Sequence, residues 1–298
     1  MDVKKIKGNT YIIDTGMSYL AFYKINETEI IMIDTGWPDE LEGIIQVFET
    51  HHLKPVAIIG THAHADHIGN NAKLKEKYGC VIAMPKEEAN NCSSLMNLKM
   101  YYNTQTQSLS DIKAHYGYMV CETDIHLFKE QQSVYLNGVK FKLFPAPGHS
   151  MALTCVITPD DVAYLADALI SKEVMEGYKL PFSFVLEQDL QSKQALKNLK
   201  CSYYIVTHKK VYQDISGLIE ENIDFYKTKA ENVYGLITKH MTMEDILKAV
   251  VKAYDIHIST VYKYNVVFRM LRCYVEYLHE TGRIKQIVDD GFVKYARC

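Results

Sequence analysis

The sequence predicts an α+β fold, in which β-sheets covered by helices are followed by a helical C-terminal region. Short apolar runs separated by polar turns recur through residues 1–212, both singly before helices and in hairpin-like pairs. From residue 213 the apolar residues recur at helical spacing instead. The composition is 48% hydrophobic and 23% charged over 298 residues, which is globular and excludes collagen, coiled coils and wholesale disorder.

The first region contains nine segments that we expect to form strands. They are rich in β-branched and aromatic residues and are bounded by turn residues: 10–13, 19–25, 29–34, 56–61, 81–84, 140–145, 155–158, 162–166 and 203–207. After the third of these, Leu41, Ile44, Ile45 and Phe48 recur at helical spacing. We expect a helix there, capped by Asp39.

Residues 86–132 depart from this pattern, because they are polar and show little strand character. We expect an inserted pair of solvated helices whose tyrosines are half-buried. The alternative is that this insert lies over a functional site, which its tyrosines would then line: Tyr101, Tyr102, Tyr116 and Tyr118.

The C-terminal region, residues 213–298, is expected to form a second, smaller domain. A helical pattern covers 214–234, Thr242 can cap a helix that runs to about Ala253, and a further helix over 259–281 ends at Gly282. Residues 283–295 indicate two short strands about an Asp-Asp-Gly turn. Helix, helix, hairpin is the order of a winged helix-turn-helix, so this domain is expected to be winged-helix-like.

Charge, hydropathy and cysteine usage indicate a cytoplasmic protein. A formal net charge of −3 gives no overall attraction to nucleic acid. No apolar run approaches the roughly 20 residues that span a bilayer, and no secretory signal is visible at the N-terminus. The seven cysteines never form a CxxC pair, which favours reduced thiols over a disulfide framework or a zinc ribbon.

Four metal-binding side chains fall within six residues of one loop: His62, His64, Asp66 and His67. This HxHxDH spacing is expected about one time in a thousand in a random chain of this composition. Imidazole and carboxylate are ligands of Zn, Fe and Mn. One short loop cannot easily wrap four ligands around one ion. His62 and His64 can point one way while Asp66 and His67 point another, so two ions are expected.

Two ions need further ligands from distant sequence, and three candidates follow later strands. His149 follows the strand at 140–145, Asp167 follows 162–166, and His208 follows 203–207. Each alone would be read as a turn histidine or a helix cap. Beside the HxHxDH loop they become the expected partners, because strand ends can converge at one edge of the sheets.

This set resembles the full ligand set of the metallo-β-lactamase superfamily over about residues 1–210. Asp34, in Ile-Asp-Thr-Gly, also matches the early strand-end aspartate of that family. The resemblance implies an αβ/βα sandwich with the metals in a shallow groove along one edge. It implies that Asp34 does not bind metal itself but positions a residue that does. By the same resemblance, one metal would be bound by His62, His64 and His149. The other would be bound by Asp66, His67 and His208, and Asp167 would bridge the two.

The resemblance also implies a metal-dependent hydrolase. Two cations about 3.5–4 Å apart lower the pKa of a shared water, so a bridging hydroxide attacks without a separate general base. Asp66 would orient this nucleophile and move its proton. Zn²⁺ is the expected metal, and Fe or Mn would fit the same donors.

Individual residues exclude some branches of the superfamily and so limit the activities that we expect. His64 stands where the flavodiiron branch typically has a glutamate, and the long C-terminal region does not suit the secreted β-lactamases. We therefore expect hydrolysis of a small ester, thioester or lactone, similar to glyoxalase II and related enzymes. A non-catalytic metal-binding sensor is a third interpretation. We rank it below small-molecule hydrolysis and below the RNA-cleaving alternative described next.

The alternative is a dinuclear endoribonuclease whose winged helix holds RNA. Residues 238–298 carry ten Lys and Arg against seven Asp and Glu, which is a weak nucleic-acid footprint. The helix over 259–281 contributes Lys263, Arg269 and Arg272 to this count. Lys209 and Lys210, directly after His208, would attract an anionic substrate tail. The expected partner is thus a small molecule, with no membrane, while a homodimer is compatible with the aromatic insert and the tail domain.

Overall fold

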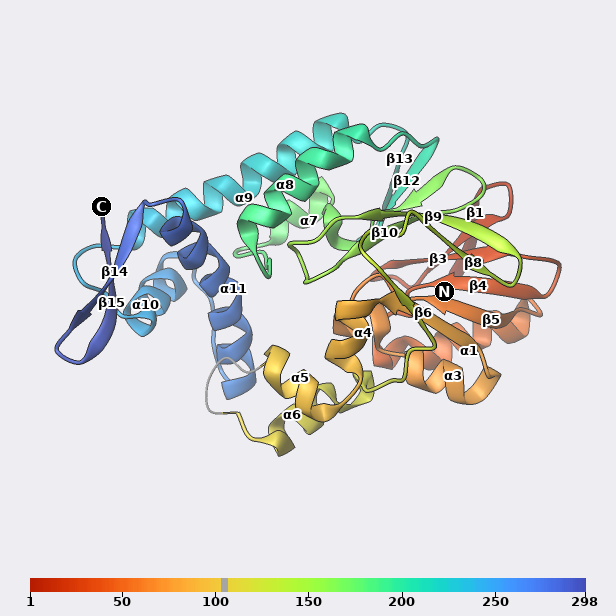
Figure 1. Ribbon diagram of the computed structural model, residues 1–298, viewed down its shortest axis with the longest axis horizontal. Coiled ribbons are helices and arrows are strands. Elements are labelled where there is room, and N and C mark those ends of the chain that lie inside the picture. Colours follow the sequence, from red (N-terminus) through yellow and green to blue (C-terminus); the bar gives the residue numbers. More distant parts are fainter. Residues whose placement is uncertain (103–106) are drawn as a thin grey trace.

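The computed structural model describes residues 1–102 and 107–298 and contains two sheets packed face to face between layers of helices (Figure 1). In the first sheet the strands are neighbours in chain order, antiparallel up to β4 and parallel from β4 to β7. Its strands are β1 (Asp2–Lys7), β2 (Thr10–Asp14), β3 (Tyr19–Lys24), β4 (Glu29–Ile33), β5 (Lys54–Ile59), β6 (Val81–Pro85) and β7 (Ile125–Leu127).

The second sheet has the order β13-β12-β11-β10-β9-β8, and only β11 and β12 run parallel. Its strands are β8 (Ser133–Leu136), β9 (Val139–Pro145), β10 (Thr154–Ile157), β11 (Val162–Tyr164), β12 (Tyr203–Val206) and β13 (Lys210–Tyr212). The mixed pairing confirms the predicted α+β class and the sandwich implied by the resemblance.

Alternation of side chains along the strands builds both faces of the first sheet. Ile12, Ile31 and Ile33 point inward and join the core shared with the second sheet. Ile13 and Met32 point outward and join a separate core with the helices on that side. These helices are α1 (Leu41–Thr50), α2 (Ala65–Ile68) and α3 (Asn71–Tyr78), and on the outer face of the second sheet lie α7 (Lys172–Gly177) and α8 (Leu186–Ala195).

Short 3₁₀ turns connect several elements: η1 (Pro38–Glu40), η2 (Gly117–Met119), η3 (Ala166–Ala168) and η4 (Leu196–Asn198). The first of these corrects one expectation. Asp39 lies inside η1 and does not cap α1, whose N-cap residue is Glu40.

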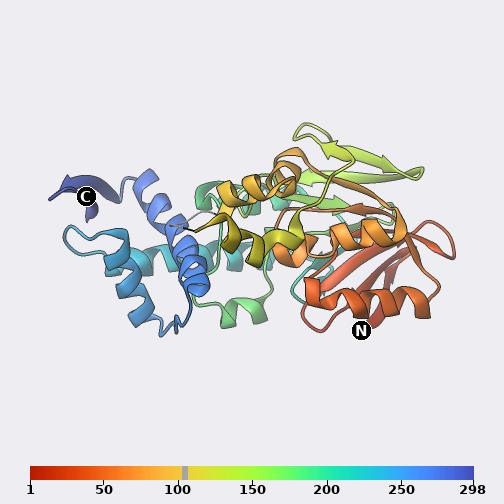
Figure 2. The same cartoon turned by 90° about the horizontal axis from the view of Figure 1, so that it is seen from below.

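The described residues of the insert at 86–132 form three helices where a pair was expected, and the chain then returns to the first sheet as its edge strand β7. The helices are α4 (Lys86–Cys92), α5 (Leu95–Tyr102) and α6 (Leu109–Tyr116). The expectation of half-buried, solvated tyrosines is wrong for Tyr102 and Tyr116, which are only 3% and 5% exposed. They are covered because the C-terminal helix α11 (Val261–Glu280) packs beside α5 and α6 (Figures 1 and 2).

The C-terminal region consists of α9 (Ser216–Leu236), α10 (Met243–Ala253), α11, β14 (Ile284–Asp289) and β15 (Phe292–Arg297). Thr242 accepts a hydrogen bond from the amide of Asp245 (3.1 Å), which closes a capping box at the start of α10. The hairpin turns at Asp290 and Gly291, both with positive φ, and projects at the end of the molecule away from the first sheet (Figure 2). Helix, helix, hairpin is thus the observed order, and the winged-helix assignment stays a prediction.

The C-terminal helices share one buried core with the second sheet. Leu218, Tyr226 and Leu271 belong to the same cluster of buried side chains as Phe141 and Ile205. Within the part of the chain that the structure describes, no helix is both long and apolar enough to cross a membrane.

Candidate metal centre

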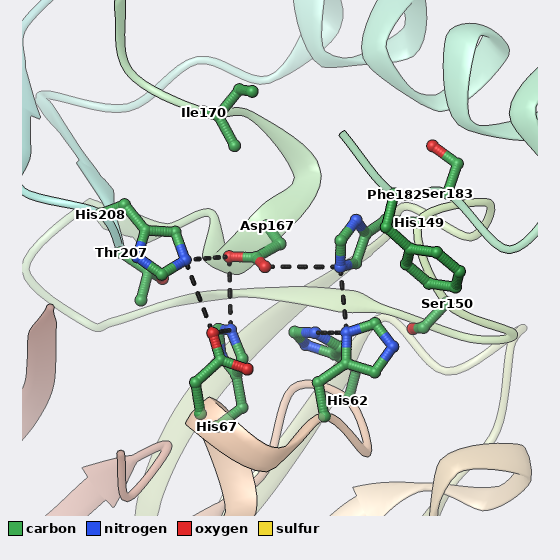
Figure 3. Close-up of polar contacts among 12 residues, drawn as sticks. His62, His67, His149, Ser150, Asp167, Ile170, Phe182, Ser183, Thr207 and His208 are labelled. Carbon is green, nitrogen blue, oxygen red and sulfur yellow. Dashed lines mark hydrogen bonds and ion pairs between the residues drawn. The ribbon is translucent and has the colours of Figure 1, made fainter. Parts of the chain in front are cut away.

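Strand ends bring all seven sequence-predicted metal ligands to one edge of the sandwich (Figure 3). His62 and His64 follow β5, and the short helix α2 carries Asp66 and His67. His149 lies in the loop between β9 and β10, Asp167 in η3 after β11, and His208 directly beyond β12. These positions agree with the sequence argument that each ligand stands just past a buried strand.

The ligand atoms form two groups, and within each group they all lie within 4.8 Å of one another. In the first, Nδ1 of His64 is 2.9 Å from Nε2 of His62 and 3.1 Å from Nε2 of His149. In the second, Nε2 of His67 and of His208 each lie 3.6 Å from Oδ2 of Asp66.

Asp167 belongs to both groups and turns one oxygen towards each of them (Figure 3). Its Oδ2 is 3.4 Å from Nε2 of His149, and its Oδ1 is 3.3 Å from Nε2 of His67 and 3.5 Å from Nε2 of His208. A carboxylate in this position is suited to bridge two cations. The HxHxDH loop therefore does divide as expected, with His62 and His64 pointing one way and Asp66 and His67 the other.

Buried polar atoms without partners indicate, independently of the ligand spacing, that these residues can bind metal ions. Nε2 of His67 and Oδ1 of Asp167 are buried and have no hydrogen-bond partner among the described residues. Buried polar atoms left in this state are costly, and a cation between them satisfies both. Nitrogen and oxygen donors without a thiolate are those that Zn²⁺, Fe and Mn²⁺ accept.

Electrostatics keeps the first group in the form that binds metal. Burial, together with the neighbouring imidazoles, lowers the pKa of His62 and His64 well below the usual range, so both are neutral ligands at pH 7. Burial would raise the pKa of Asp167, but His67 and His208 hold it well below its usual range, so the Asp167 carboxylate is charged.

Hydrogen bonds behind the ligands set their tautomers. The Thr61 hydroxyl donates to Oδ2 of Asp34 (2.8 Å), so it is left to accept from Nδ1–H of His62 (3.0 Å). Asp34 also accepts from Nδ1–H of His67 at 2.6 Å. Both histidines are therefore oriented with Nε2 towards the centre, so that atom is the one that would bind a metal ion. On the other side, Nε2 of His64 faces the hydroxyl of Tyr101 at 3.0 Å, leaving Nδ1 for a metal.

A buried glutamate that sequence reasoning missed joins the two ligand loops. Glu88, in α4, accepts from the amide of Ala63 (2.9 Å), the hydroxyl of Ser150 (2.7 Å) and the amide of Ala152 (2.7 Å). Burial raises its pKa, and the three donors offset that penalty. Nothing in its local sequence distinguishes Glu88 from a surface helix residue, so only its place in the fold shows this function.

Unusual backbone conformations accompany the centre. Asp34 and Ala166, which precedes Asp167, have φ of +60° and +48°. Such values cost free energy in residues other than glycine and mark positions that the surrounding structure holds in place. Gly148, before His149, has φ of +125°, and a Cβ there would lie 2.1 Å from the amide nitrogen of Asp189. A side chain at Gly148 would thus displace the His149 loop.

A cavity of about 240 Å³ opens directly over both ligand groups, and the C-terminal helix α11 forms part of its wall. Seven aromatic side chains line it beside the ligands: Trp37, Tyr102, Tyr116, Tyr178, Phe182, Tyr226 and Tyr262. Two insert tyrosines therefore line the site, as the alternative interpretation of the insert proposed.

Lys209 and Lys210 do not line this cavity. Lys210 pairs with Glu173 at the surface (2.5 Å), and the cation at the cavity is Arg269 of α11.

Known proteins resemble the chain in sequence and fold. The model of the metallo-beta-lactamase superfamily matches residues 8–208, which is more than half of the chain. A probable metallo-hydrolase of Streptococcus pyogenes serotype M6 is 27% identical over 168 residues, 55% of this chain and 66% of that protein. A hydroxyacylglutathione hydrolase of Serratia proteamaculans is 23% identical over 134 residues, 45% of this chain and 40% of that protein.

Structural similarity extends further along the chain. The crystal structure of a metallo-beta-lactamase family protein from Thermus thermophilus superposes with a TM-score of 0.69 at 17% identity, over 94% of both chains. Coverage that wide includes most of α9–α11, so the C-terminal helices are part of a shared fold. The chain therefore belongs to the metallo-β-lactamase superfamily and is a hydrolase of that fold.

Proposed function

We propose that the protein hydrolyses a small ester, thioester or lactone, with the two ligand groups holding two divalent ions, Zn²⁺ in preference to Fe or Mn. The observation that carries this proposal is the aromatic cavity of about 240 Å³ that lies over both groups. It has room for the reacting part of a small molecule. The hydroxyacylglutathione hydrolase among the relatives, a thioesterase by its name, lends support.

Two divalent ions, when bound, would supply an activated water at neutral pH and polarise the carbonyl oxygen of the substrate. The chain's own residues then have separate tasks. Asp167 holds the two ligand groups in register through its two oxygens. Asp66 lines the cavity and its side chain is 16% exposed, so it is placed to orient the attacking water and accept its proton. The aromatic walls limit the access of bulk water.

The structure offers less support for an endoribonuclease. An RNA strand needs an open groove with cations along it. Here α11 places Tyr262, Val266 and Met270 against the cavity, and Arg269 is the single Lys or Arg side chain among the lining residues described.

We further propose a reducing compartment such as the cytoplasm, which is supported by seven free cysteines.

A paired turnover assay tests the proposal. Metal-replete protein is given S-lactoylglutathione and, separately, a single-stranded RNA. We expect thioester cleavage that falls about a hundredfold or more in Asp66→Ala, because this change removes both a ligand and the proton acceptor. Atomic absorption should find two metal ions per chain in the parent protein and fewer in Asp66→Ala.

Asp39→Ala is the matched control, since Asp39 is an exposed aspartate in η1 that lines neither cavity nor ligand group. It should retain both turnover and metal content. RNA cleavage with the same dependence on Asp66 would replace the esterase proposal by the endoribonuclease. Full metal occupancy without turnover on either substrate or on nitrophenyl esters would favour the non-catalytic sensor.

A further inference from the structure

Arg269 is a cation at the cavity that has no anionic partner among the described residues. It lines the 240 Å³ cavity together with His64 and Asp66. It also lines an adjacent cavity of about 650 Å³ that lies between α4, α5, α11 and the segment 182–185. Its guanidinium group therefore lies between the candidate metal centre and the larger space beside it.

Aromatic rings hold the guanidinium in place. The Cζ atom of Arg269 is 4.5 Å from the ring centroid of Tyr102 and 5.3 Å from that of Phe182. Phe182 in turn packs edge-on against His64 and His149, with ring centroids 5.5 and 5.8 Å apart (Figure 3). Tyr116 lines the same cavity as this guanidinium. A planar cation fixed by rings in this way loses little freedom when it binds a ligand.

The hydrogen-bonding capacity of Arg269 is only partly used. Within the described ranges, its buried Nε has no hydrogen-bond partner and no carboxylate lies within ion-pair distance of the side chain. The other three arginines differ. Arg272 pairs with Glu276, Arg283 with Glu231, and Arg297 donates to two backbone carbonyls. A half-buried guanidinium without a counter-charge is costly, and the space in front of it is a substrate cavity.

We propose that Arg269 binds a carboxylate of the substrate and so selects anionic esters or thioesters. The reacting carbonyl would lie at the metal centre, and the rest of the molecule would extend into the 650 Å³ cavity. That cavity combines side-chain amides with apolar surface, from Asn90, Asn91, Met100 and Met151, and the charges of Arg272 and Glu276 on its wall are paired with each other. The inference rests on the proposed hydrolytic function and defines its substrate class. The planar fork of the guanidinium matches a carboxylate in two hydrogen bonds, which a lysine cannot reproduce.

A matched pair of esters tests this selection. Mono-4-nitrophenyl adipate carries a free carboxylate, and its methyl ester has the same chain with the charge masked. The metal-replete protein should release nitrophenolate from the anionic ester with a kcat/KM about tenfold or more above that of the methyl ester. In Arg269→Gln this ratio should collapse by a similar factor, and in Arg269→Lys it should be intermediate.

Lys263→Gln is the control, because it removes one positive charge from an exposed position on the same helix, away from both cavities. It should leave the ratio unchanged. A parent protein without preference for the anionic ester would overturn the proposal. So would an Arg269→Gln variant in which both rates fall by the same factor, which would show that Arg269 only supports the fold.

A binding measurement separates this proposal from the hydrolytic one. Trp37 is the only tryptophan and lines the cavity, so its fluorescence reports occupancy. The parent protein should bind 3-phenylpropionate about tenfold more tightly than 3-phenylpropionamide, and Arg269→Gln should bind both alike. If no ester is hydrolysed but this difference persists, the hydrolytic function fails while the anion site stands. Equal affinity of the parent protein for the two probes would reject the anion site.

Discussion

Single hydrogen bonds behind the cavity decide whether the candidate ligands can bind metal. A histidine ligates through an unprotonated nitrogen, so the proton has to be held on the other ring nitrogen. Thr61 does this for His62 and Asp34 for His67, and the two supports are themselves hydrogen-bonded to each other. The second group of ligands therefore depends on Asp34 although Asp34 does not reach the centre.

Substituting Asp34→Asn should weaken metal binding about 10- to 100-fold. An amide in this place can turn its NH₂ towards Nδ1 of His67 and so favour the tautomer with its proton on Nε2, the atom that would bind the metal. The residue tolerates the change locally, because asparagine accepts the positive φ of +60° found there. Competition with a chromophoric chelator measures the affinity. Unaltered affinity would show that Asp34 does not control the tautomer of His67, and Asp39→Asn serves as the control.

At the scale of elements, one helix of the insert keeps two ligand loops together. The carboxylate of Glu88 in α4 is the common acceptor for the loop after β5 and the loop between β9 and β10. These loops carry His62, His64 and His149, which come from different sheets. The insert therefore positions the first group of ligands as well as covering the cavity.

Replacing this carboxylate by Glu88→Ala should reduce the free energy of unfolding by about 3 kcal/mol, since three buried donors lose their acceptor. Urea denaturation of the metal-free protein measures the loss. The adjacent Glu87→Ala, which removes an exposed carboxylate from the same helix, should change stability by less than about 0.5 kcal/mol. Equal stability of the two variants would mean that water replaces Glu88 at no cost.

At the scale of the whole molecule, the C-terminal helices complete the site and are not an appendage to it. Asn222 of α9 donates to the carbonyl of Ile170 (2.9 Å) and accepts from its amide (3.0 Å), three residues beyond the candidate ligand Asp167. The hydroxyl of Tyr274 in α11 donates to the carbonyl of Pro181 at 2.7 Å, next to Phe182 in the cavity wall. Side chains of both helices lie in the shared core.

A chain truncated after residue 212 should therefore fail to fold cooperatively, because it exposes the core surface that α9 and α11 cover. We expect the full chain to unfold in one transition by both near- and far-ultraviolet circular dichroism, and the fragment to show no near-ultraviolet signal. As a milder test, Asn222→Ala should cost about 1–3 kcal/mol, since it leaves the Ile170 backbone unsatisfied. A truncated chain that folds and binds metal would establish two independent domains instead.

Sequence patterns by themselves determined the interior of the sandwich and which residues cluster as candidate metal ligands. All nine strands predicted from apolar runs are present. The four strands that were not predicted, β1, β7, β8 and β13, are the four edges of the two sheets. Edge strands are short or carry charge on their open side, as in Asp-Val-Lys-Lys-Ile-Lys of β1, so they lack the apolar signal of central strands. The candidate ligands were recognisable because metal binding requires particular donors, here at strand ends, and both features are local.

Only the tertiary structure decided what surrounds those ligands. Glu88, Tyr101 and Arg269 have ordinary sequence contexts, and each acquires its function from a partner far along the chain. The polar composition of the insert predicts solvated tyrosines, yet a helix more than 140 residues later covers them. Periodicity reports which face of an element is buried, but it carries no information about which distant element does the burying. The cavity and the guanidinium of Arg269 come together at such a long-range contact, so the substrate preference that we propose could not be found in the sequence.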